Sequence, residues 1–262
     1  MKLLKIFSFI YSQLYFKYRM YRKIMDLPSL DRTTSPKDLM YHSDPQNYFF
    51  WGGSALDSVQ EMLELAGKTS IRALLDLPSG YGRELRFFKV AFPQTEITAC
   101  DIDQDAVNFC VETFNVKGVY SNSDPLFIPI TDQFDLIWCG SLFTHFGAEN
   151  WHRLLHFCRQ RLEIDGILIF ATHGSFVAEF LRDGLLDLDL DKKGIQQILE
   201  NFDICGFGYT DYFGQLNYGI SLSSAAWVNL FLQQWPELKY YLIKQKGGVI
   251  GMIHSHSYAQ DN

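Results

Sequence analysis

The stretch LLDLPSGYGR, residues 74–83, places one carboxylate and two glycines directly after an apolar run. Asp76 stands at the end of that run, and Gly80 and Gly82 follow it closely. Glycines at this spacing let the backbone approach a ligand and open a helix. A pyrophosphate loop would need GxGxxG and a triphosphate loop would need Gly-Lys-Ser/Thr, and the stretch contains neither. A single acid before a short glycine turn suits a ligand with a nucleoside and an ammonium group.

A second carboxylate, Asp101, ends the segment EITACD about 25 residues after Asp76. A carboxylate at the end of a parallel strand can accept hydrogen bonds from both hydroxyls of a ribose. The competing interpretation is that Asp101 caps the helix that follows. Asp103 fits that cap better, so we expect Asp101 to face a ligand.

Two later segments also carry polar groups just after apolar runs. The segment YSNSDP offers Asn122 or Ser123 to the edge of a base, and WCGSLFTHF presents Ser141, Phe143 and His145. Ligands of open parallel sheets bind at the carboxyl ends of the strands. We therefore expect these groups and the first two carboxylates to meet at one edge of a sheet.

The elements that must position these groups alternate regularly from about residue 54. Strands are expected over residues 71–76, 96–101, 116–120, 134–139 and 166–172, and helices over 55–66, 82–91, 104–114 and 150–162. This alternation predicts βαβ units and an α/β fold, a doubly wound, mostly parallel sheet with helices on both faces. After Thr172 helices are expected over 176–182, 192–201 and 222–234, a loop or cap over 206–219, a strand over 238–245, and at best a weak strand after 247.

Composition narrows the functional classes. The 262-residue chain is 47% hydrophobic, enough for one sizeable core, and its net charge of −7 argues against nucleic acid as a partner. Its five cysteines lie scattered in apolar runs, which predicts buried free thiols in the cytoplasm and no metal site.

Residues 1–25 combine six Lys or Arg side chains with an apolar helical stripe and contain no acid. The segment is too charged to span a bilayer, and no cleavage site of a secretory signal follows it. One interpretation is a helix lying on an anionic membrane, at its inner face. The alternative is a helix that packs on the domain or on a partner subunit.

Taken in order, DLPSGYGR, CDID, FDLIWCGSLFTH and FATHG resemble the class I S-adenosylmethionine (SAM)-dependent methyltransferases, over roughly residues 45–245. The similarity is strongest to a bacterial group often associated with glycan and polysaccharide assembly. It implies a Rossmann-like, seven-stranded sheet with an N-terminal helical extension and a cap inserted in the C-terminal half. The domains expected are a helix and lid over 1–53 and a methyltransferase domain over 54–262, with an acceptor-binding insertion over about 174–235.

The resemblance also implies roles for individual residues. Asp76, Gly80 and Gly82 match the residues that hold the methionine part of SAM, Asp101 matches the ribose ligand, and Asn122 and Ser123 fall near the adenine. The full set expected to bind SAM, and its product S-adenosylhomocysteine (SAH), is Asp76, Pro78, Ser79, Gly80, Gly82, Arg83, Asp101, Ile102, Asn122, Ser123, Gly140 and Ser141. Pro78 departs from the family's first glycine, which makes the loop stiffer.

Methyl transfer to a hydroxyl benefits from a general base, and His is the usual one near neutral pH. His145 follows the fourth strand and His173 ends the fifth, so both are candidate catalytic residues, although each could instead be structural. The expected acceptor site is aromatic and polar, with Tyr48, Trp51, Phe143, Tyr209, Asp211, Tyr212 and Tyr218.

Three functions remain open at this point. The first is O-methylation of a small-molecule or glycan acceptor, with a sugar hydroxyl as the first expectation. The second is O- or N-methylation of a natural product, and the third is a SAM-binding scaffold without catalysis, which Pro78 motivates. Neither the acceptor, nor the methylated atom, nor the oligomeric state follows from the sequence.

Overall fold

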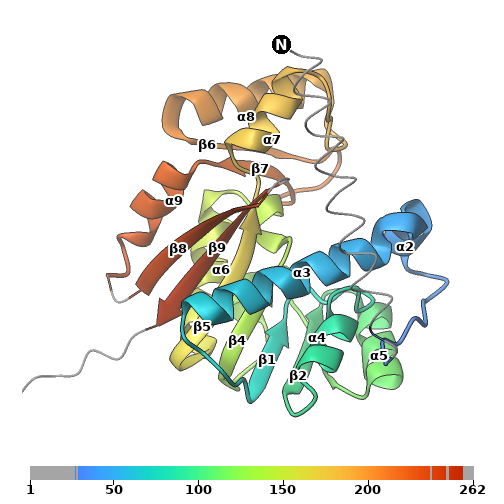
Figure 1. Ribbon diagram of the computed structural model, residues 1–262. Helices are drawn as coiled ribbons and strands as arrows, with labels where there is room; N and C mark the ends of the chain where they lie inside the picture. Colours follow the sequence, from blue (N-terminus) through green and yellow to red (C-terminus); the bar gives the residue numbers. More distant parts are fainter. Residues whose placement is uncertain (1–26, 28, 237, 246–247, 256–262) are drawn as a thin grey trace, which may run out of the picture.

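The computed structural model describes residues 27, 29–236, 238–245 and 248–255 of the chain. Its main sheet has seven strands in the order β3-β2-β1-β4-β5-β9-β8 (Figure 1). The strands are β1 Ala73–Asp76, β2 Glu96–Asp101, β3 Lys117–Tyr120, β4 Phe134–Cys139, β5 Leu162–Thr172, β8 Leu238–Gln245 and β9 Gly248–Ser255. The first five are parallel, and β9 is antiparallel to both β5 and β8. The expected α/β class and mostly parallel sheet are confirmed.

Helices cover both faces of the sheet. They are α2 Leu39–Ser43, α3 Pro45–Leu65, α4 Leu85–Ala91, α5 Gln104–Phe114, α6 Ala148–Arg161, α7 Ser175–Arg182, α8 Lys192–Cys205 and α9 Ala225–Leu232, with short 3-10 turns η1 Pro125–Phe127 and η2 Leu142–His145. Successive strand residues point to opposite faces. Leu74 therefore packs in the core with α3, α4 and α5, whereas Leu75 packs in the core with α6 and α9.

The segment after β5 forms a small layer of its own. Helices α7 and α8 pack with a two-stranded antiparallel hairpin, β6 Phe207–Asp211 and β7 Gly219–Ser223, above the carboxyl end of the main sheet (Figure 1). This layer falls within the expected insertion of residues 174–235. It brings the hairpin next to η2, because the Ser221 hydroxyl donates to the carbonyl of Phe143 at 2.9 Å.

Several element boundaries differ from those expected. Residues 206–219 are not simply a loop, because two short strands there pair across a turn. The helix expected over 222–234 is the end of β7 followed by α9, and Ser224 caps that helix by accepting from Trp227 N. Helix α3 begins at Pro45, ten residues early, so residue 53 lies inside it. The weak strand signal after 247 corresponds to β9, which completes the sheet.

Four of the five cysteines are buried free thiols as expected, but Cys205 is exposed at the end of α8. None of the helices within the described ranges is long and apolar enough to cross a membrane. Residues 1–25, for which we expected a basic amphipathic helix, lie outside the described residues.

Candidate functional site

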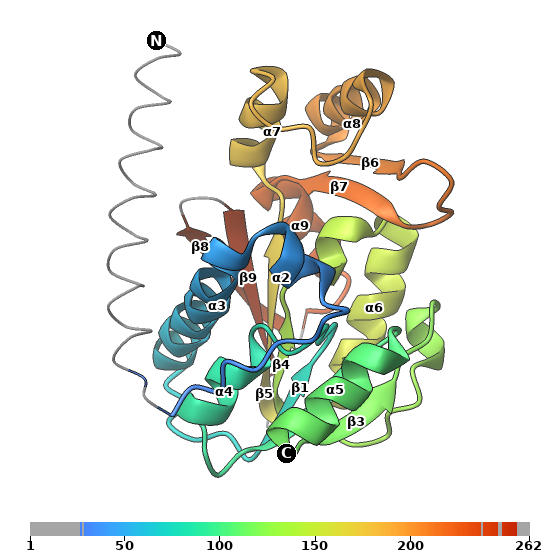
Figure 2. The same ribbon diagram turned by 90° about the vertical axis from the view of Figure 1, so that its right-hand side faces the viewer.

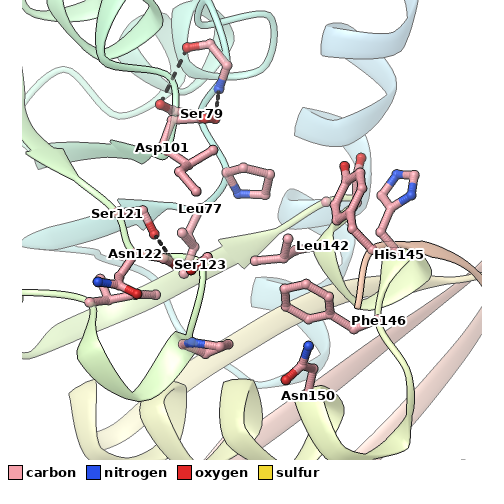
Figure 3. Close-up of a pocket in the computed structure, with 18 of the residues that line it drawn as sticks. Leu77, Ser79, Asp101, Ser121, Asn122, Ser123, Leu142, His145, Phe146 and Asn150 are labelled. Atoms are coloured by element: carbon pink, nitrogen blue, oxygen red, sulfur yellow. Dashed lines mark hydrogen bonds between the residues drawn. The ribbon is translucent and has the colours of Figure 1, made fainter. Parts of the chain in front are cut away.

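A cavity of about 1010 Å³ opens at the carboxyl ends of β1, β2 and β4, between the main sheet and the β6–β7 hairpin. Figure 3 shows Asp101 and Asn122 on one side of it, with His145 and Phe146 across from them. Of the residues expected at the site, the cavity is lined by Tyr48, Pro78, Ser79, Gly80, Arg83, Asp101, Ile102, Asn122, Ser123, Gly140, Ser141, His145, Tyr209 and Tyr218. The strand ends therefore bring together groups that are far apart in the sequence.

The turn Ser79–Gly82, which we call the glycine turn, is held in a shape that only glycine adopts easily. Gly80 and Gly82 have φ angles of 48° and 72°, and the Leu77–Pro78 peptide bond is cis. Gly82 N donates to Ser79 O at 3.0 Å, and a Cβ on Gly82 would lie 2.5 Å from the Phe114 ring. Gly82 itself does not line the cavity, so its role is to pack the turn against α5.

Asp76, the last residue of β1, does not itself line the cavity, but it lies within electrostatic reach of Glu84 and Asp101, which do. Its side chain is fully buried, and neither carboxylate oxygen has a hydrogen-bond partner. Burial raises the pKa of Asp76 well above its usual value, and the nearby charges of Glu84 and Asp101 raise it further. A buried carboxylate without a partner costs free energy unless a ligand satisfies it. A cationic group bound at the end of β1 would do so, which fits the ammonium group of SAM.

Asp101 is anchored as a ribose ligand would need to be. Its Oδ2 accepts from Gly80 N at 2.7 Å, and its Oδ1 accepts from Asp103 N at 2.9 Å. Burial raises the pKa of Asp101, while these two bonds act in the opposite direction. As expected, the helix cap belongs to Asp103, whose side chain accepts from Asp105 N and Ala106 N. Each Asp101 oxygen still has accepting capacity toward the cavity.

Arg83 and Glu84 add opposite charges near Asp76. Both line the cavity, both are largely buried, and Arg83 donates through Nε and Nη2 to Glu84 Oε1 at 2.7 Å. The Glu84 charge raises the pKa of the Arg83 guanidinium against the effect of burial. A guanidinium beside carboxylates suits a zwitterionic ligand. The carboxylate of such a ligand would lie near Arg83, and its ammonium group would lie near the acidic side chains. The residues present therefore fit the amino-acid end of SAM.

The polar groups after β2, β3 and β4 line the rest of this half of the cavity. Ile102 follows Asp101 and is 62% exposed. The Asn122 side chain is held in place because its Oδ1 accepts from Asp124 N at 2.9 Å. A Cβ on Gly140 would lie 2.9 Å from the Trp138 indole nitrogen, so a larger residue would push against this wall. The arrangement leaves an apolar and amide-lined space that suits an adenine.

On the opposite side, His145 presents an imidazole with a fixed tautomer. Its Nδ1 lies 2.8 Å from the carbonyl oxygen of Gly219, and a carbonyl can only accept, so Nδ1 carries the hydrogen. Burial lowers the pKa of His145 below 6.5, which keeps the ring neutral near pH 7. Nε2 then carries the free lone pair. The ring also stacks on Tyr218, with centroids 4.9 Å apart.

One residue expected to be catalytic, His173, and two expected to bind the acceptor, Phe143 and Trp51, lie outside the cavity. His173 does not line the cavity, and burial lowers its pKa to about 4, so it is a poor partner for a substrate. Phe143 was expected at the acceptor site, but it is buried in the core against Trp151 and Phe170, because η2 turns it inward. Trp51 is on the outer part of α3, outside the cavity.

Two of the four hairpin residues expected to bind acceptor reach the cavity. Tyr209 and Tyr218 line it. Asp211 does not, and it accepts a hydrogen bond from the Tyr209 hydroxyl instead. Tyr212 also lies outside the lining, with its hydroxyl 3.5 Å from His145 Nδ1. Asp211 and Tyr212 therefore contact residues that line the cavity, Tyr209 and His145, without lining it themselves.

The cavity has further walls that the sequence reasoning missed. The missed lining residues are Asp38, Met40, Leu77, Tyr81, Glu84, Ser121, Asp124, Pro125, Ile128, Trp138, Leu142, Phe146, Gly147, Ala148, Glu149, Asn150, Arg153, Gln215, Leu216 and Asn217. No local pattern indicates Asp38, because it lies in the N-terminal segment, far in sequence from every strand end. Arg153 lies on the inner face of α6, where it binds both oxygens of Asp124 at 3.0–3.1 Å. Arg153 follows Glu149 by four residues, a spacing in the sequence that predicts an ion pair on one face of α6.

Comparisons with known proteins agree with this geometry. Residues 75–168 match the model of a methyltransferase domain family. The malonyl-[acyl-carrier protein] O-methyltransferase of Bacillus cereus is 28% identical over 112 residues, which cover 42% of this chain and 41% of that protein. The chain thus spans well under half the length of this curated relative.

Solved structures share the fold at low sequence identity. A protein from Pyrococcus horikoshii OT3 superposes with a TM-score of 0.54 at 14% identity, over 78% of this chain and 90% of that one. The plantazolicin methyltransferase BpumL, solved with a monoazolic desmethylPZN analog and SAH, gives 0.55 at 12% identity, over 94% and 99%. The family match over residues 75–168, the strand order and the site geometry all agree with a SAM-dependent methyltransferase domain.

Proposed function

We propose that this protein transfers the methyl group of SAM to a hydroxyl of a sugar or polyol acceptor. When bound, SAM supplies an electrophilic methyl group, so the protein needs only to align the acceptor and exclude water. The observation that carries the proposal is His145, a neutral imidazole in the cavity whose Nδ1 is committed to the Gly219 carbonyl. Its Nε2 is the atom that would take the proton of an attacking hydroxyl.

The lining around His145 supports a polyhydroxylated acceptor. Tyr209 and Tyr218 offer ring faces and hydroxyls, and the amides of Asn150, Gln215 and Asn217 lie on the same side of the cavity. Rings pack on the C–H face of a sugar, while amides donate to and accept from neighbouring hydroxyls. We therefore assign residues 174–235 the role of an acceptor cap, because β6 carries Tyr209 and the turn before β7 carries Tyr218.

A second candidate is a larger natural-product acceptor. Met40 and Leu216 line the cavity and are also 53% and 83% exposed, so its mouth is partly apolar. BpumL, a plantazolicin methyltransferase that shares the fold, was solved with a monoazolic desmethylPZN analog. An acceptor with an apolar body could cover these two side chains while its reacting group reaches His145.

Acceptor screening separates the two candidates. The purified chain is incubated with SAM carrying a trideuterated methyl group and with two panels, simple glycosides and azole or aromatic natural products. The proposal predicts a mass increase of one labelled methyl on a glycoside oxygen, abolished by His145→Asn. Labelling of natural products alone would favour the second candidate, and SAM binding without labelling of any acceptor would favour a non-catalytic scaffold.

We also propose that the enzyme acts in the cytoplasm, with residues 1–25 holding it at the inner face of the membrane. The support is their six basic side chains and apolar stripe. Flotation with liposomes containing phosphatidylglycerol tests this. Loss of flotation on deletion of residues 1–25 is expected, and equal flotation of both forms would contradict it.

A further inference from the structure

The N-terminal residues 30–44, which we call the strap, form part of the cavity wall. Figure 2 shows the strap crossing in front of α4 on its way to α2. Leu30 is buried in the core with α3 and α4, and Lys37 Nζ reaches Asp105 Oδ2 on α5 at 2.5 Å. Asp38 and Met40 of the strap line the cavity near the glycine turn. The strap thus spans three helices before it reaches the site.

One buried side chain, Arg86 at the start of α4, joins the strap to the glycine turn. Arg86 is 1% exposed. On one side, its Nη1 donates to the strap carbonyls of Asp31 at 3.2 Å and Thr33 at 2.9 Å. On the other side, its Nε donates to Gly82 O at 2.9 Å and its Nη2 to Tyr81 O at 3.2 Å.

The fifth donor of Arg86 is directed at Tyr48 on α3. Nη2 lies 3.5 Å from the Tyr48 hydroxyl, and that hydroxyl donates to Asp38 Oδ2 at 2.6 Å. Asp38 is itself fixed, because its Oδ1 accepts from Met40 N and Tyr41 N. Arg86 therefore reaches Asp38 through Tyr48 as well as holding the strap backbone directly.

The chemistry of this contact requires arginine. All five N–H groups of the guanidinium have an oxygen within 3.5 Å, and each of those oxygens belongs to a neutral group. The rings of Tyr48, Phe49 and Phe114 lie 5.0–5.5 Å from the guanidinium carbon and further stabilise its charge. Lysine has three donors on one atom and cannot hold carbonyls on both sides at once.

We propose that Arg86 is a positioning residue for SAM binding: it clamps the strap to the glycine turn, so that both walls of the amino-acid end of the cavity are set by one side chain. The inference rests on the proposed cofactor. Arg86 itself does not line the cavity and acts through Gly82, Tyr81 and the strap. Loosening the clamp frees the strap and the turn together, and SAM must then order both on binding.

The test uses the full chain with Arg86→Lys and Arg86→Met, and two readouts. The first is the rate of tryptic cleavage after Arg32 and Lys37 in the strap, without ligand. The second is the dissociation constant of SAH, measured by calorimetry. We expect cleavage in the strap to rise at least about tenfold and SAH binding to weaken about tenfold, as loss of charged hydrogen bonds would give. Arg86→Lys should lie between wild type and Arg86→Met.

Two control variants distinguish loss of the Arg86 contacts from a general loss of folding stability. Arg72→Met removes an arginine whose side chain is 79% exposed, and Ile198→Val trims the core of α8, far from the strap. Neither should change strap cleavage or SAH affinity. If Arg86→Met does not fold, the same two readouts are measured on Arg86→Lys and on Tyr48→Phe, which removes the hydroxyl between Arg86 and Asp38.

Strap cleavage and SAH affinity within twofold of wild type in the folded Arg86 variants would overturn the clamp. Faster cleavage with unchanged SAH affinity would also overturn it, since the strap would then be irrelevant to the cofactor. Absence of SAH binding in the wild type would instead contradict the proposed function, and the cleavage rates would still show whether Arg86 holds the strap.

Discussion

His145 Nδ1 lies 2.8 Å from the carbonyl oxygen of Gly219, at the first residue of β7. This contact fixes the tautomer of a histidine on η2 by a backbone group of the inserted hairpin, 74 residues later. It couples the proposed base to the hairpin whose turn carries Tyr218. The inserted hairpin and the proposed base therefore belong to one unit of the proposed acceptor site.

The contact predicts how activity depends on pH. His145 is active as a base only when neutral, and burial lowers its pKa below 6.5. We expect kcat to stay constant as pH falls to about 6.5 and to decline only below that value. His145→Asn should lower kcat by about 10²–10⁴-fold and remove this acidic limb, with SAH affinity unchanged.

The matched control for that variant is His152→Asn, on the exposed side of α6. It should keep wild-type kcat and the wild-type pH profile. If His145→Asn retains kcat within tenfold and the same acidic limb, another group accepts the proton.

We expect the buried carboxylate of Asp76 to lower the folding stability of the protein while it favours cofactor binding. Its pKa in the folded protein lies above the unfolded value of 3.8, so the folded state binds the extra proton and its stability falls as pH rises above that value. Asp76→Asn does not titrate. Urea denaturation should therefore show a gain in unfolding free energy for the variant that is larger at pH 8 than at pH 5.

The same substitution should weaken SAH binding at pH 8, because it removes the charge that the ammonium group would meet. A variant that is less stable than wild type at both pH values would show that the carboxylate has a partner within the protein. Unchanged SAH affinity would remove Asp76 from the cofactor site.

Alanine substitutions at Gly82 and Gly67 separate the cost of backbone strain from the cost of steric overlap with a neighbouring side chain. Both have positive φ, 72° and 66°, but a Cβ on Gly82 would lie 2.5 Å from the Phe114 ring, whereas one on Gly67 meets nothing within 4 Å. Gly67→Ala should cost about 1 kcal/mol from backbone strain. Gly82→Ala should cost a further ~1–3 kcal/mol from overpacking, as measured by urea denaturation. Equal costs would mean that Phe114 moves aside freely.

The sequence predicted the main sheet and its ligand-binding edge because buried parallel strands leave a local signal. The runs ALL in β1 and LIWC in β4 are continuous and apolar, since both faces of these strands are covered. The distinction between Asp101 and Asp103 was also local, because a helix cap needs only its own first turn. Polar residues at the strand ends therefore predicted many of the residues that line the cavity beside β1, β2 and β4.

The remaining parts of the fold and of the cavity depend on contacts between residues far apart in the sequence, which no local pattern predicts. Glycine and tyrosine dominate residues 206–219, a composition that indicates a loop or cap, whereas the two strands there exist only by pairing with each other. Phe143 looked like an acceptor residue, but the direction of η2 buries it. The strap was missed because Arg86 binds carbonyls 53 and 55 residues earlier, and backbone oxygens are the same in every sequence.

The most direct test of the account is calorimetric titration of the wild type, Asp101→Asn and Asp132→Asn with SAM and SAH. Asp132 is an exposed acid outside the cavity and serves as the matched control. The account predicts one binding site in the wild type and in Asp132→Asn, and affinity at least about tenfold weaker in Asp101→Asn, where a ribose ligand is lost. Absence of binding in the wild type, or equal affinity in all three proteins, would contradict it.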